Sequence, residues 1–178
     1  MENIRKEVLK TARKIEGDSI YLGKGHYHAS IFWSSMNYWI GVPIAAIAAV
    51  ISALTFTKYH IAAGVLAILV SMLTALTTFL NPNEKSGSHY NSFNSYKSLA
   101  NKINIFCTVD SLFETSKMNL VNKLKEFENE FDELNQNSPQ IPKWALNKAK
   151  NCLNNKKADD LFCRKKDNMS SELPDIKK

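Results

Sequence analysis

The sequence has few of the residues that build metal and redox sites. Its three cysteines, Cys107, Cys152 and Cys163, show no C-x-x-C spacing and have no suitable histidine partners. They predict neither a metal site nor a disulfide framework, and we expect unpaired thiols. The four histidines form no His-x-x-x-His pair, and His26 and His28 would diverge on one helix. The sequence therefore predicts no bound metal.

Catalytic motifs are also missing. The short cluster Gly23-Lys24-Gly25 is far too short for a phosphate-binding P-loop, and no serine occupies a nucleophile elbow. We therefore predict that the protein is not an enzyme, that it has no catalytic residues and that it uses no cofactor.

Charge is absent from two long stretches. Residues 31–57 and 61–83 contain no Asp, Glu, Lys or Arg, although the chain carries 23 basic and 17 acidic residues. A bilayer core of ~30 Å needs about 20 helical residues, so we predict an all-α membrane protein. Its spans cover about 36–56 and 61–80, and the short linker between them makes a two-span hairpin. A buried soluble hairpin is the alternative, but two such adjacent runs are uncommon in soluble cores.

Flanking residues predict the orientation of this hairpin. The linker Thr57-Lys58-Tyr59-His60 carries one basic residue, whereas six precede residue 31 and sixteen follow Leu80. Because basic residues are concentrated on the cytoplasmic side of membrane proteins, both termini are expected in the cytoplasm. Trp33, Tyr38 and Trp39 cluster at the entrance to the first span, where they are interface anchors.

Outside the spans, the pattern divides the chain into three parts. Residues 1–24 read as an N-terminal amphipathic helix and a glycine-containing linker, and a second helix starts near Gly25. Residues 25–135 contain the hairpin, an exit turn at Asn81-Pro82-Asn83 and a long cytoplasmic helix over about 84–134. Residues 136–178 form a flexible basic tail, with a short helix from Lys143 to Leu153.

The long helix is expected to carry a heptad seam, because residues on one stripe alternate in steps of four and three. The stripe contains Leu99, Ile103, Phe106, Asp110, Phe113, Lys117, Leu120, Leu124, Phe127, Phe131 and Leu134. Its polar members, Asp110 and Lys117, could pair between subunits and set the register of a coiled-coil assembly. The other interpretation, which we favour, is that they face the edge of a bundle within one chain.

The spans carry stripes of small and hydroxyl-bearing residues. Ser71, Thr74, Thr78 and Asn81 share a face of the second span, and Ser52 and Thr55 extend a small-residue stripe on the first. Such stripes serve either close helix packing or the lining of a pore. Because one hairpin cannot enclose a channel, conduction requires a homo-oligomer.

The basic tail has three interpretations. It is a solvated end, a contact for the anionic leaflet, or a contact for nucleic acid or a nucleotide. Sparse aromatic residues argue against a platform for single-stranded nucleic acid.

Several segments resemble the SLATT domain of bacteria over about residues 20–135. They are Gly25-His26-Tyr27-His28-Ala29-Ser30, Gly41-Val42-Pro43, Phe79-Leu80-Asn81-Pro82-Asn83-Glu84-Lys85, and the run from His89 to Leu99 that continues to Ile105-Phe106. SLATT proteins are regarded as two-span effectors of antiviral defence.

The resemblance implies a function. It suggests an inner-membrane protein of bacterial antiphage defence that forms a pore or disrupts the membrane and causes abortive infection. The implied partners are a separately encoded nucleotide synthase, a SLOG sensor or a reverse transcriptase. His89 could be a gating residue at the membrane exit, or an interfacial histidine bonded to nearby backbone. The other hypotheses are a membrane-tethered scaffold that conducts nothing and a membrane-anchored nucleotide or nucleic-acid binder.

Overall fold

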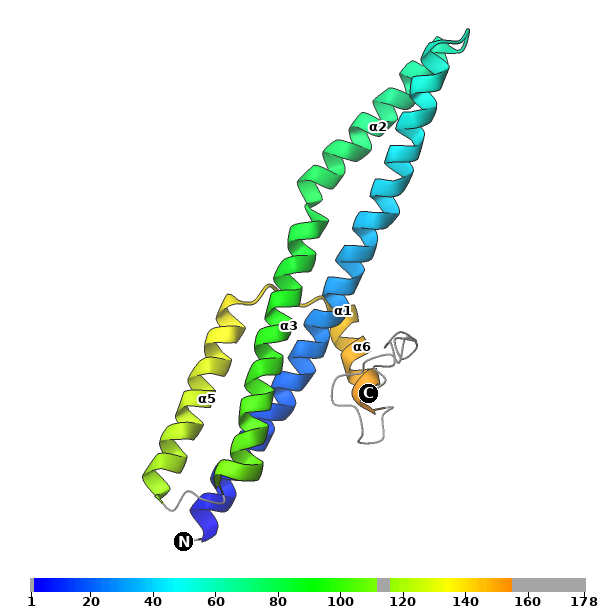
Figure 1. The fold of residues 1–178 in the computed structure, drawn as a ribbon. Coiled ribbons are helices and arrows are strands. Elements are labelled where there is room, and N and C mark those ends of the chain that lie inside the picture. Colours follow the sequence, from blue (N-terminus) through cyan, green and yellow to red (C-terminus); the bar gives the residue numbers. More distant parts are fainter. Residues whose placement is uncertain (1, 112–115, 155–178) are drawn as a thin grey trace, which may run out of the picture.

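The computed structural model describes residues 2–111 and 116–154, and these residues are almost entirely helical. The elements in chain order are α1 (Glu2–Thr55), α2 (His60–Leu80), α3 (Pro82–Ile105), the π-helix η1 (Phe106–Asp110), α5 (Lys117–Asn137) and α6 (Lys143–Asn154). The second half of α1 and the whole of α2 form a hairpin that projects from a bundle of the remaining helices (Figure 1).

The hairpin contains two helices that are long and apolar enough to cross a membrane. In the most apolar stretch of α1 none of the residues is buried, and in that of α2 only 6% are. Both the N-terminal residue of α1 and the C-terminal end of α6 lie away from the hairpin tip (Figure 1). The prediction of two apolar helices with span-like length is confirmed.

The N-terminal helix and the first span are one continuous helix, so the predicted interruption between Gly17 and Gly25 is wrong. Glycine at positions 23 and 25 allows close packing instead of a break. A Cβ on Gly23 would lie 3.3 Å from Cβ of Tyr96, and one on Gly25 would lie 3.1 Å from Cδ2 of Leu146. The proposed domain boundary at residue 24 therefore falls inside α1, which also continues through Pro43.

Asn81 separates α2 from α3, as the Asn-Pro exit motif predicts. It has a φ of 42° in the left-handed region, which asparagine tolerates better than most residues. Its backbone N–H donates to the carbonyl of Thr77 at 3.0 Å, and Pro82 begins α3. Proline suits this first position because its missing N–H would have no partner within the helix. The break at the end of α2 is therefore encoded locally.

The predicted single helix over 84–134 is wrong. α3 and η1 end at Asp110, and α5 begins at Lys117 and returns antiparallel along α3 (Figure 1). Three contacts at increasing sequence separation define the return. They join Phe106 to Phe127 (ring centroids 5.4 Å apart), Lys102 to Glu130 (2.7 Å) and Tyr96 to Asn135 (2.7 Å).

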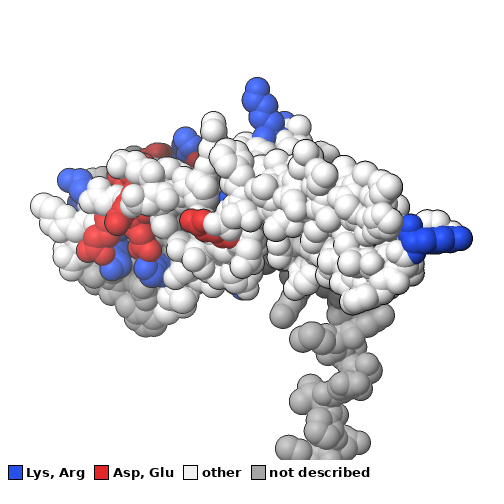
Figure 2. Space-filling model, turned by 90° about the horizontal axis from the view of Figure 1, so that it is seen from above, with Lys and Arg blue, Asp and Glu red and all other residues white. Residues whose placement is uncertain are grey.

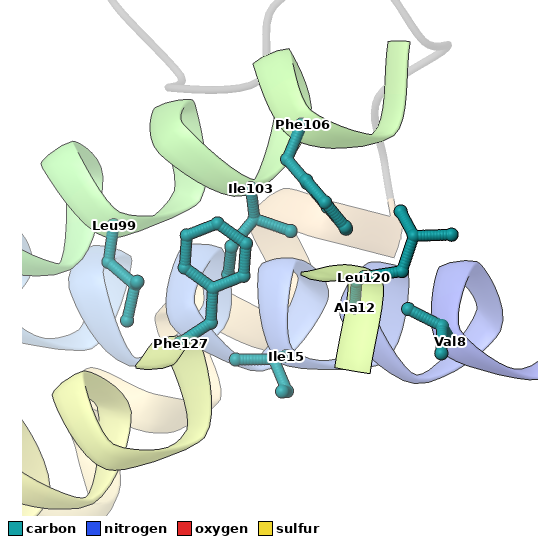
Figure 3. Close-up of a cluster of buried hydrophobic side chains, with 8 residues drawn as sticks. All are labelled: Val8, Ala12, Ile15, Leu99, Ile103, Phe106, Leu120 and Phe127. Atoms are coloured by element: carbon teal, nitrogen blue, oxygen red, sulfur yellow. The ribbon is translucent and has the colours of Figure 1, made fainter. Parts of the chain in front are cut away.

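The heptad seam is consequently folded onto itself and onto α1. Eight buried side chains form the core: Val8, Ala12, Ile15, Leu99, Ile103, Phe106, Leu120 and Phe127. In Figure 3 the side chains of α3, η1 and α5 point toward those of α1. The intramolecular interpretation of the seam therefore describes this core. Asp110 and Lys117 end one helix and begin another, so they do not share a helical stripe.

The predicted helix at Lys143 is present as α6, and it packs on α1. This part of the predicted flexible tail is therefore ordered against the bundle. Residues 155–178 lie outside the described residues. Cys107 is a free thiol as predicted, but Cys152 is disulfide-bonded, so the expectation of unpaired thiols is wrong there. Cys163 lies outside the described range.

Candidate functional site at the base of the hairpin

Five hydroxyl groups that the sequence singles out on the hairpin are bonded to their own helix. Each donates to a carbonyl in the preceding turn. These bonds are Ser52 to Ala48 (3.0 Å), Thr55 to Ile51 (2.8 Å), Ser71 to Ala67 (2.8 Å), Thr74 to Val70 (2.8 Å) and Thr78 to Thr74 (2.9 Å). All five residues are exposed on the hairpin surface. A hydroxyl bonded in this way is compatible with an apolar surrounding, because its proton is already satisfied.

The predicted anchors lie at the base of the hairpin, where α1 leaves the bundle. Trp33 is partly buried, and the Lys85 ammonium lies 4.6 Å from its ring centroid. Tyr38 and Trp39 are exposed. Trp144 of α6, which the sequence reasoning did not count among the anchors, packs against Phe32 at a centroid separation of 5.0 Å. Three parts of the chain thus bring aromatic or basic groups to one level of the molecule.

Just below this level, two histidines meet in the interior. Nδ1 of His26 on α1 lies 2.9 Å from Nδ1 of His89 on α3. His26 is 1% exposed and His89 is 5% exposed. One ring must donate and the other accept, because only one proton can lie between the two nitrogens. The pair therefore ties α1 to α3 only while at least one ring is neutral.

The surroundings of the pair favour neutral rings. Burial lowers the pKa of His26 to about 4, and the nearby His89 adds to this effect. Burial also lowers the pKa of His89. The pKa of His28 is lowered by burial and then by the positive charges of Lys148 and Lys24. Neutral, hydrogen-bonded histidines at neutral pH are therefore part of the folded structure.

Neighbouring side chains hold this pair in place. The ring of Tyr96 stacks on His26 with centroids 5.5 Å apart, and its hydroxyl donates to Oδ1 of Asn135 on α5 at 2.7 Å. Ser86 donates to the carbonyl of Ser30 at 3.0 Å, which adds a second tie between α3 and α1. The α1–α3 junction is thus fixed by a continuous set of polar contacts.

The prediction for His89 identified the residue but missed its partner. His89 lies seven residues before Tyr96 and fourteen before Ile103, so it extends the buried stripe of α3. On α1, His26 shares a stripe with the buried residues Ser19, Gly23 and Ser30. Both stripes are visible in the sequence, but only the fold pairs them. The distance between the two rings could not be read from either stripe alone.

No protein-family model, curated protein or solved structure matches this chain. Among the residues that the structure describes, no group of three His, Cys, Asp or Glu side chains is placed to hold a metal ion. The likeness to SLATT proteins therefore rests on the sequence segments alone.

Proposed function

We propose that this protein is a membrane-embedded effector whose α1–α2 hairpin inserts into a bilayer while its helical bundle stays in the cytoplasm. The observation that carries the proposal is the bare apolar surface of the hairpin. Phe56 is 92% exposed and Phe79 is 86% exposed, at opposite ends of the same hairpin. Apolar patches larger than a few hundred Å² are rare on soluble monomers and mark interaction with a membrane or another protein.

The distribution of charge supports insertion. Most charged residues, including the acidic ones, gather over one side of the molecule in Figure 2, and the surface of the other side is mostly uncharged, with a few Lys or Arg side chains at its edges. As helices, both make their backbone hydrogen bonds internally apart from the one that Pro43 cannot donate, which suits a segment in lipid. The hydroxyls of the spans are satisfied in the same way.

The resemblance to SLATT proteins extends this proposal from membrane insertion to an effector role. Several hairpins associate through their small-residue faces and permeabilise the bacterial inner membrane, which causes abortive infection. A separately encoded partner, such as a nucleotide synthase, a SLOG sensor or a reverse transcriptase, supplies the trigger. Both termini then lie in the cytoplasm, next to that partner.

A membrane-potential dye tests the effector role. It is used in bacteria that express the full chain together with its neighbouring genes. A triggered culture should depolarise, whereas a variant with Leu69 and Leu76 both changed to Lys should not insert and should leave the potential unchanged. Charged residues at the centre of a span cost about 2.5–3.5 kcal/mol each by insertion scales. An unchanged potential with well-expressed, membrane-inserted wild-type protein contradicts the pore.

The hydrogen bonding of the span hydroxyls favours a second candidate, a non-conducting membrane tether that presents its bundle to a partner. Hydroxyls that donate to their own carbonyls need no water. Changing Ser71, Thr74 and Thr78 together to Leu separates the two candidates. A pore should lose conductance while it still assembles, and a tether should keep its partner binding and its function.

A further inference from the structure

A cavity of about 330 Å³ opens at the point where α2 ends and α3 begins. Phe79, Leu80 and Pro139 form its apolar wall. Because Leu80 is the last residue of α2, the cavity lies at the level where the apolar surface of the hairpin gives way to the polar bundle. If the hairpin is inserted as proposed above, this level coincides with the lipid headgroups.

The opposite wall of the cavity is polar and carries both signs of charge. Glu84, Lys85 and Ser88 contribute to it, and all three are exposed. The side-chain amide of Asn81 donates to Oε2 of Glu84 and so holds the carboxylate at the cavity. The ammonium of Lys85 lies over the ring of Trp33. The cavity is therefore lined by one acidic and one basic side chain beside an apolar surface.

The remaining polar wall adds no further charge. His89 lines the cavity, and its bond to His26 and its burial keep the pair neutral at neutral pH. A ligand that matches this lining has one negative group for Lys85, one positive group for Glu84 and an apolar portion for Phe79. Basic pockets beside membrane helices on the cytoplasmic side bind lipid headgroups, and the added carboxylate here selects for a zwitterion.

We propose that this cavity binds the headgroup of an aminophospholipid of the phosphoethanolamine type, an inference that rests on the proposed membrane insertion. The lipid phosphate accepts from Lys85 and from the Ser88 hydroxyl. The primary ammonium donates to the Glu84 carboxylate. The apolar chains leave past Phe79 along the hairpin surface. A choline headgroup lacks N–H donors for Glu84, and a glycerol headgroup has no cation for it.

Native mass spectrometry tests this site. The full chain is released from nanodiscs that contain equimolar phosphatidylethanolamine and phosphatidylcholine with identical acyl chains. Retained lipid should be enriched in phosphatidylethanolamine. Glu84→Gln should reduce the enrichment about two- to fivefold, the range for partly exposed charge pairs, whereas Lys85→Gln should reduce the retention of both lipids, because both carry the phosphate. Lys85→Arg should restore that retention. Lys58→Gln at the hairpin tip is the matched control and should leave enrichment and retention unchanged.

The outcomes distinguish a failure of the headgroup site from a failure of hairpin insertion. Equal retention of the two lipids, or the same enrichment in Glu84→Gln as in the wild type, overturns the headgroup site while insertion stands. A preference for phosphatidylglycerol in a second nanodisc series means that Lys85 acts alone, which overturns the zwitterionic ligand. If soluble phosphoethanolamine is retained by the protein as strongly as phosphatidylethanolamine, the lipid is overturned as the source of the headgroup. A chain that does not enter nanodiscs overturns both this site and the proposed function.

Discussion

The two halves of α1 belong to one unbroken helix, but they meet different surroundings. In the bundle, Val8 is 5% exposed and packs against α5 and η1 as part of the core. In the hairpin, Val42 on the same helix is 65% exposed. The bundle half buries much of its surface and carries charged residues, two of which, Glu16 and Lys24, are buried, whereas the hairpin half is uncharged on every side. The bundle half therefore packs its apolar residues within the chain, whereas the hairpin half leaves most of its apolar surface exposed.

The largest contrast between the halves should appear in leucine truncation. Leu99→Ala removes a fully buried core side chain and should lower the free energy of unfolding by about 3–5 kcal/mol. Leu76→Ala on the exposed face of α2 removes no intramolecular packing and should change it by less than about 0.5 kcal/mol. Chemical unfolding in detergent measures both. Equal losses would contradict the division into a packed bundle and a bare hairpin.

Acid should weaken the bundle through the His26–His89 pair. The folded pKa of His26 is lowered to about 4 from an ordinary value of 6.5, so between these values the unfolded chain binds a proton that the folded chain does not. Stability from this group is therefore complete above pH 6.5 and falls as the pH drops toward 4, by about 3 kcal/mol.

Two variants test whether the His26–His89 pair causes this loss of stability in acid. His26→Gln should flatten the dependence of unfolding free energy on pH between 6.5 and 4, and His60→Gln at the exposed hairpin tip should preserve the wild-type slope. His28 contributes equally to both variants, whereas His89 loses its partner only in His26→Gln. If the two slopes agree, the buried pair is not the cause.

The sequence predicts the hairpin better than the bundle for a physical reason. Two charge-free runs separated by a short linker leave little choice of structure, and Asn81-Pro82 ends a helix through its own backbone preferences. The bundle depends on contacts between distant segments. The heptad stripe predicts which residues are apolar, such as Phe106 and Phe127, but it does not say whether the partner is another chain or the same chain turned back.

At two glycines, local helix propensity and tertiary packing have opposite effects. On sequence alone, Gly23 and Gly25 indicate a break, since glycine lowers helix stability. In the fold, their missing side chains admit Tyr96 and Leu146 close to α1. The site was predicted incompletely for the same reason, because the pairing of His26 with His89 depends on this close approach of α1 and α3.

A glycine-to-alanine pair tests this interpretation. Gly17→Ala faces open space and should raise the free energy of unfolding by about 0.5–1 kcal/mol through helix propensity. Gly25→Ala gains the same propensity, but its Cβ meets Leu146 and Ile141 at 3.1 and 3.2 Å, and it should lower stability by about 1 kcal/mol. Thermal unfolding compares them directly. Stabilisation by both variants would show that α6 does not pack on α1 as described.

The smallest effect should come from the ion pair between α3 and α5. Lys102 and Glu130 lie 2.7 Å apart, but both side chains are exposed, so solvent screens their attraction. Lys102→Gln should cost about 0.5 kcal/mol, and high salt should remove the difference from the wild type. Phe127→Leu, which truncates a buried ring of the core, should cost more and should keep most of its effect in salt. A salt-sensitive loss in Lys102→Gln that exceeds the loss in Phe127→Leu would mean that charge, not the apolar seam, holds α5 against α3.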